Sequence, residues 1–151
     1  MPRFKLPSWG SDGHRSRDKS EIIKSEKEDE RYGLFVFENK PADDARAIDI
    51  VAVHGLNGHY EKTWSTHVNG GQDVNWLRNF LPKQIDNARV MSFGYNSVLQ
   101  FSKSVADVYN FAEQLLEMFF SKRVTEQEQS RPIMFICHSL GGIVVKQVCL
   151  L

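Results

Sequence analysis

Apolar and polar positions along the chain mark out four candidate strands with helical segments between them. The segments 32–39, 47–55, 89–95 and 132–137 are rich in β-branched and aromatic residues, which predicts strands. The runs "AIDIVAVHG" and "PIMFIC" are almost continuously apolar. The first of these runs is typical of a strand that is buried on both faces of a parallel sheet.

Helical patterns occupy the intervals between these strands. Asp73 can cap a helix that ends at Pro82, and Ser104 can cap a longer helix whose apolar residues keep to one stripe. A further helix is expected from Ser139 onward. Strands that alternate with helices imply βαβ units with right-handed crossovers. The predicted fold class is therefore α/β, with a mostly parallel sheet and flanking helices.

Two polar stretches differ from this pattern. Residues 1–30 hold too few apolar side chains to offset the entropy of ordering, so we expect a disordered polar tail at 1–30 and one domain at 31–151. The connection before the last strand is also charged, and we expect it to be solvated. Its charged residues are Lys122, Arg123, Glu126, Glu128 and Arg131.

Composition narrows the possible partners and compartments. The 151 residues carry a formal net charge of zero, which argues against nucleic acid as a partner. Cys137 and Cys149 have no zinc-binding spacing, and we expect free thiols in a reducing compartment and no metal. No segment has the pattern of a transmembrane helix or a secretory signal peptide, so we expect an intracellular protein. Unless it associates with an organelle membrane, we expect it in the cytoplasm.

The segment "CHSLG", residues 137–141, carries the clearest chemical signal. It resembles the Gly-x-Ser-x-Gly turn that presents a nucleophilic serine between a strand and a helix. The strained turn requires small residues two positions to either side of Ser139, and Gly141 and Cys137 are small. An apolar strand precedes the pentad, and a helix that includes Gly142 follows it. The context therefore favours Ser139 as a nucleophile.

A second motif, "VAVHGLNGH", places His54 and Gly55 at the end of a buried strand. In folds with a nucleophile elbow, an oxyanion hole takes one backbone N–H from the loop after this strand and one from the residue after the nucleophile. Those groups would be the N–H groups of Leu56 and Leu140. Gly55 and Gly58 allow close backbone approach to a substrate. His54 is expected to pack its ring behind this loop.

Together these motifs resemble the α/β-hydrolases of the lipase-like, serine-active-site-containing group, most closely the hydrolase domains at the N-termini of fungal NACHT-type multidomain proteins. The resemblance covers about residues 34–151. It implies hydrolysis of carboxylic esters or lipids without a metal or cofactor, and an association with the endoplasmic reticulum, the mitochondrion or their membranes. The matching residues are His54-Gly55-Leu56, Gly58, Thr63-Trp64, Trp76-Leu77, Leu81-Pro82, Arg89-Val90, Phe93-Gly94-Tyr95 and Cys137 to Lys146.

The catalytic partners of the serine are the missing part of this pattern. Triad order in this fold is Ser, then Asp or Glu, then His, and no Asp, Glu or His follows Ser139. We therefore expect the N-terminal half of an α/β-hydrolase fold, truncated after the elbow, with negligible esterase turnover. His138 is expected at the pocket wall, and His59 is the alternative base.

The alternative function is that of a non-catalytic remnant or a signalling or interaction module of the same fold. If no strand covers one side of residues 132–137, an apolar strand becomes an open edge of the sheet. Open apolar edges pair with other chains. We therefore expect self-association through this edge.

Overall fold

The computed structural model describes residues 31–39, 46–68, 71, 73–98 and 105–151. Its main sheet has four strands in the order β1-β5-β2-β6, and β5, β2 and β6 run parallel while β1 is antiparallel to β5. The strands are β1 Gly33–Asn39, β2 Ile48–Val53, β5 Ala88–Gly94 and β6 Ile133–Cys137. Each lies where an apolar run predicts it. The α/β class with a mostly parallel sheet and flanking helices is confirmed.

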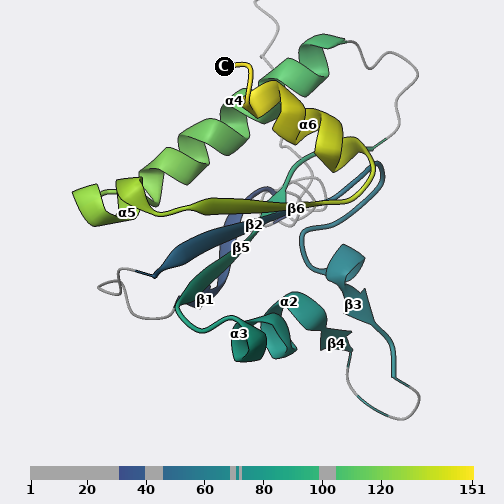
Figure 1. Ribbon diagram of the computed structural model, residues 1–151. Helices are drawn as coiled ribbons and strands as arrows, with labels where there is room; N and C mark the ends of the chain where they lie inside the picture. Colours follow the sequence, from purple (N-terminus) through teal and green to yellow (C-terminus); the bar gives the residue numbers. More distant parts are fainter. Residues whose placement is uncertain (1–30, 40–45, 69–70, 72, 99–104) are drawn as a thin grey trace, which may run out of the picture.

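Helices cover both faces of this sheet (Figure 1). On one face lie α4 Val105–Ser121 and α6 Leu140–Val148, and on the other lie α2 Trp76–Asn79 and α3 Leu81–Gln84. The smaller elements are η1 Lys62–Trp64, α5 Glu126–Ser130 and the two-stranded sheet of β3 Ser65–Thr66 and β4 Val74–Asn75. The predicted tail at 1–30 and the cap at Ser104 lie outside the described residues.

Alternate residues of the central strands feed two separate cores, because successive side chains of a strand point to opposite faces. Val51 and Val53 of β2 pack with α4 and α6, whereas Ile50 and Ala52 pack with Leu77 on the α2 side. All four of these β2 residues have no exposed surface. The apolar run of β2 is therefore explained by burial on both faces.

The start of the helix near residue 75 differs from the prediction. Asn75 caps α2, because its side-chain oxygen accepts a hydrogen bond from the Arg78 N–H at 3.2 Å. Asp73 precedes the extended β4 instead of starting a helix. Pro82 does not end a helix but lies in the first turn of α3. Proline fits there because the first-turn N–H groups have no partner within the helix.

The charged connection at 122–131 is exposed at Lys122 and Glu126, as predicted, but Arg123 and Arg131 are buried, which the prediction missed. Arg89 binds the fully buried Asp49 through two hydrogen bonds of 2.8 Å. Nη1 of Arg123 lies 3.4 Å from an oxygen of Asp49, and Nη1 of Arg131 lies 3.7 Å from the other oxygen. Glu128 accepts a bond of 2.8 Å from Arg89. We call Asp49, Arg89, Arg123, Glu128 and Arg131 the ionic cluster.

Candidate active site

Ser139 stands at the junction between β6 and α6 in a strained backbone conformation. Its φ of 52° and ψ of −120° are rare for a residue with a side chain, and the residue is exposed. The turn is fixed by hydrogen bonds of 3.0 Å from His138 N–H to the Val53 carbonyl and from Gly141 N–H to the His138 carbonyl. This is the backbone geometry that a nucleophile elbow requires.

The two glycines after Ser139 have different surroundings. A Cβ on Gly141 would collide with the carbonyl oxygen of Val53 and lie 2.7 Å from that of His54. Both are backbone atoms that cannot move aside without shifting the strand. A Cβ on Gly142 would meet nothing closer than 3.9 Å, at the side chain of Cys137. The close approach of α6 to β2 therefore requires glycine at position 141 only.

The loop after β2 packs directly against the serine turn. A Cβ on Gly55 would lie 2.8 Å from the Cβ of Ser139 and 2.9 Å from Nδ1 of His138. The loop closes with a hydrogen bond of 3.0 Å from Gly58 N–H to the Gly55 carbonyl. Leu56, at the tip of this loop, is 41% exposed. The structure thus brings both sequence motifs together at the carboxyl ends of β2 and β6.

His54 lies beneath this loop and is 1% exposed. Its Nδ1 is 2.9 Å from the Gly55 carbonyl, and its Nε2 faces the Tyr95 N–H at 3.4 Å. Burial lowers the pKa of His54, which favours the neutral imidazole. Because both ring nitrogens are engaged, His54 is not placed to act as a base toward Ser139. Tyr95 was not predicted as a site residue, although its position directly after a buried strand is a signal for one.

The other described histidines have different surroundings. Nδ1 of His59 accepts the Glu61 N–H at 3.1 Å and so helps to begin η1, and burial lowers the pKa of His59. Nδ1 of His67 lies 2.7 Å from a carboxylate oxygen of the exposed Asp73. His138 is exposed, with Nδ1 against Gly55. The alternative base His59 is therefore already engaged as a backbone cap.

Neither a metal centre nor a membrane span is found within the described ranges. No three His, Cys, Asp or Glu side chains of those residues are grouped so that they could hold a metal ion. No helix in the same part of the chain is both long and apolar enough to cross a bilayer.

Comparisons with known proteins agree with this geometry. The family model described as "Putative serine esterase (DUF676)" matches residues 49–150. Protein SERAC1 of Danio rerio is 27% identical over an alignment of 119 positions, and the match covers 68% of this chain and 18% of that protein. No solved structure matches the chain. The matched range contains β2, the loop after it and the serine turn, and the chain belongs to the serine esterase family DUF676.

Proposed function

We propose that the protein is a serine acyl hydrolase in which Ser139 attacks carboxylic-ester or lipid substrates. The observation that carries the proposal is the backbone of Ser139, which is held at φ 52° and ψ −120° between strand β6 and helix α6. A serine kept in such a costly conformation, and exposed, is typical of a nucleophile. Membership of a serine esterase family supports the same reaction.

In the proposed reaction, Oγ of Ser139 forms a bond to the carbonyl carbon of the ester. The carbonyl oxygen becomes negatively charged, and the N–H groups of Leu56 and Leu140 donate hydrogen bonds to it. The alcohol then leaves with a proton, and water releases the acid from the acyl-enzyme. The packing of Gly55 against Ser139 supports this placement of the Leu56 N–H, because Leu56 is the next residue.

A general base must take the proton of Ser139. Among the described residues no side chain is hydrogen-bonded to the Ser139 hydroxyl, and His138 is exposed beside it. The Nδ1 atoms of His54, His59 and His67 are engaged with other groups, and Asp49 is held by arginines at the opposite end of β2. In subtilisin, loss of the catalytic histidine lowers kcat by about 2 × 10⁶. We therefore expect negligible turnover of p-nitrophenyl esters by the 151-residue chain.

A fluorophosphonate probe tests the nucleophile without requiring turnover. The probe forms a bond from Oγ to phosphorus, fluoride leaves the phosphorus, and the serine proton passes to solvent. The phosphoryl oxygen, which gains negative charge in the transition state, is placed in the same hole. We expect slow labelling that peptide mass spectrometry assigns to Ser139 and that the Ser139→Ala variant lacks, because oxyanion contacts alone retain about 10³–10⁴ of rate enhancement in such sites. Labelling spread evenly over other serines would contradict the proposal.

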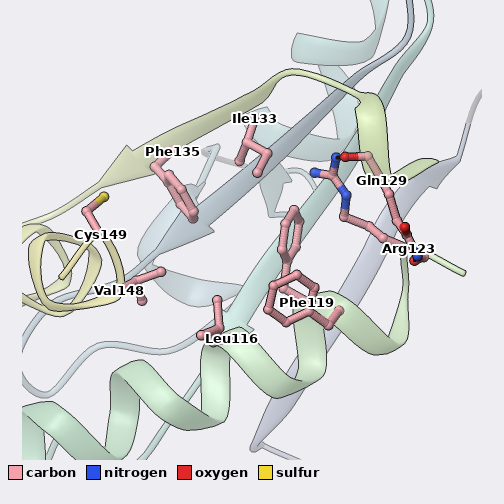
Figure 2. A pocket seen from close by; sticks show the side chains of 9 residues that line it. Leu116, Phe119, Arg123, Gln129, Ile133, Phe135, Val148 and Cys149 are labelled. Carbon is pink, nitrogen blue, oxygen red and sulfur yellow. Dashed lines mark hydrogen bonds between the residues drawn. The ribbon is translucent and has the colours of Figure 1, made fainter. Parts of the chain in front are cut away.

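A second candidate function, that of an interaction module, is favoured by the position of β6 at the edge of the sheet that the described strands form. This strand pairs with β2 on one side, and Ile133 and Met134 are 45% and 44% exposed. Beside it, a hollow of about 480 Å³ opens between β6, α4 and α6 (Figure 2). Its walls include the apolar side chains of Leu116, Phe119, Ile133, Phe135 and Val148.

We propose a second copy of the chain as the occupant of this edge. Residues 133–137 carry no charge, so two β6 strands can lie antiparallel about a two-fold axis without electrostatic repulsion. We expect a dimer whose proportion rises with protein concentration in sedimentation velocity. Met134→Lys should yield a monomer, whereas the control Val36→Lys on the opposite edge, at a side chain that is 42% exposed, should not. A wild-type monomer at every concentration would exclude this role.

A further inference from the structure

The loop from His54 to Gly58 needs a support on its inner side. Its bonds within the turn and to the neighbouring loop are Gly58 N–H to the Gly55 carbonyl and Asn57 N–H to the Ser97 carbonyl, both 3.0 Å. These bonds shape the loop, but they do not tie its first residue to the sheet core. An oxyanion hole tolerates little displacement, because its donors must lie within about 2.7–3.1 Å of the developing charge.

Tyr95, at the end of β5, meets this loop from the core. Its hydroxyl donates a hydrogen bond of 2.7 Å to the carbonyl of His54, and the tyrosine is 2% exposed. The Tyr95 ring lies parallel to the His54 ring at 4.4 Å and packs against Phe93 and Phe111 with centroids at 5.2 and 4.7 Å. The hydroxyl is therefore carried by a ring that its neighbours hold in place.

The His54 ring completes a reciprocal arrangement. A carbonyl oxygen can only accept, so the contact of 2.9 Å with the Gly55 carbonyl places the ring hydrogen on Nδ1. Nε2 then carries a lone pair that faces the Tyr95 N–H at 3.4 Å. A Cβ on Gly58 would lie 2.7 Å from Nδ1, so the loop closes tightly over the ring. The ring thus links the end of β5 to the carbonyl of the loop.

We propose that Tyr95 and His54 are positioning residues that hold Gly55 and the Leu56 N–H against Ser139. Neither residue is proposed to touch the reacting atoms. They act by fixing the backbone that donates to the oxyanion, with Tyr95 holding the carbonyl of His54 and His54 holding that of Gly55. The expected effect on the reactivity of Ser139 rests on the proposed esterase function. The effect on the position of the loop can be measured without it.

Tyr95→Phe is the sharpest test, because it removes the hydroxyl and keeps the stacked ring. We expect labelling of Ser139 by the fluorophosphonate to slow about tenfold, the effect of losing one hydrogen bond. Tyr109→Phe, which changes a 41% exposed tyrosine on α4, is the matched control and should label at the wild-type rate. In a Ser139→Cys background, alkylation by iodoacetamide should stay unchanged in Tyr95→Phe, because that displacement develops no oxyanion.

Hydrogen exchange at the Gly58 amide, which is bonded to the Gly55 carbonyl at 3.0 Å, separates this inference from the proposed function. We expect this amide to exchange about tenfold faster in Tyr95→Phe than in Tyr109→Phe, under conditions where amides exchange through local opening and not through global unfolding. If the wild-type protein is not labelled at Ser139, the esterase proposal fails, and this exchange measurement still decides the positioning role. Unchanged exchange at the Gly58 amide, or an unchanged labelling rate in a protein that is labelled, would overturn the inference.

Discussion

The two ends of strands β2, β5 and β6 are built from different chemistry. At the amino ends, the buried carboxylate of Asp49 binds Arg89 through two hydrogen bonds of 2.8 Å. At the carboxyl ends there is a buried histidine, His54, a glycine without room for a Cβ, Gly55, and the strained Ser139. The amino ends are held together by buried ion pairs, and the carboxyl ends by close contact between backbone segments.

The residues that stabilise the sheet and the residues of the candidate active site therefore lie at opposite ends of these strands. Backbone strain of the kind at Ser139 costs about 1–3 kcal/mol and persists only where the surroundings enforce it. A buried ion pair adds little net stability, but removing one partner is strongly destabilising. The amino ends should therefore control whether the sheet forms, and the carboxyl ends should control what the serine can do.

Asp49→Ala should produce the largest effect on folding. It leaves Arg89, Arg123 and Arg131 without their shared carboxylate in a site where Asp49 has no exposed surface. We expect the free energy of unfolding in urea to fall by about 3–5 kcal/mol. The control Glu117→Ala, at an exposed position of α4, should change it by less than about 0.5 kcal/mol.

The same variant also tests the separation of the two ends. Molecules of Asp49→Ala that remain folded should react with the fluorophosphonate at the wild-type rate, because the ionic cluster lies at the opposite ends of the strands from Ser139. A folded variant with a much slower reaction would show that the two ends are coupled.

Gly141→Ala should affect both stability and reactivity. The new methyl group would press on the carbonyl oxygens of Val53 and His54, and overpacking of this kind costs about 1–3 kcal/mol. Displacement of α6 should also slow the labelling of Ser139. Gly142→Ala is the matched control, because its methyl group has space and alanine favours a helix, so its free energy of unfolding should be equal or higher.

The carboxyl ends were largely predictable from the sequence, because their requirements are local. A strand, a small-residue turn and a helix follow one another within residues 132–151, so "CHSLGG" predicts its own geometry. The pairing of this turn with Gly55 also followed from the two motifs, since both end parallel strands. The position of Tyr95 directly after a buried strand was a signal for a site residue, but nothing in "FGY" shows that its hydroxyl meets a backbone carbonyl.

The amino ends were not predictable in the same way, because the ionic cluster joins residues distant in sequence. Asp49 and Arg89 are separated by 40 positions, and the connection at 122–131 resembles any solvated charged segment. One signal was present. An aspartate inside the apolar run "AIDIVAV" must find a partner, because a buried charge is seldom left unpaired.

Ser139→Gly should have a smaller effect, in the direction of higher stability. Glycine adopts positive φ without steric cost, so relief of the strain at φ 52° should raise the free energy of unfolding by about 1 kcal/mol relative to Ser139→Ala. Both variants lack the nucleophile and should not be labelled, and alanine keeps the strain. Equal stabilities in thermal and urea unfolding would mean that the turn at Ser139 is not strained.

Acidification should distinguish the two ends by the pH at which each loses stability. Burial lowers the pKa of His54, and the neighbouring His59 and His138 lower it further. Below about pH 6.5 the unfolded state therefore binds more protons at this histidine than the folded state does. Stability from His54 is therefore present above that pH and lost below it. The pKa of Glu128 in the ionic cluster is lowered, chiefly by the Thr125 N–H, so its contribution is lost only near and below about pH 4.3.

The variant His54→Asn isolates the first of these transitions, because asparagine keeps an N–H donor near the Gly55 carbonyl and does not titrate. Between about pH 7.5 and about pH 5.5, the free energy of unfolding should fall less in His54→Asn than in the wild type. Tyr95, which also faces this ring, has a raised pKa and stays protonated throughout that range. An equal fall in both proteins would mean that protonation of other groups causes the acid sensitivity, and that His54 does not stabilise the carboxyl ends through its neutral form.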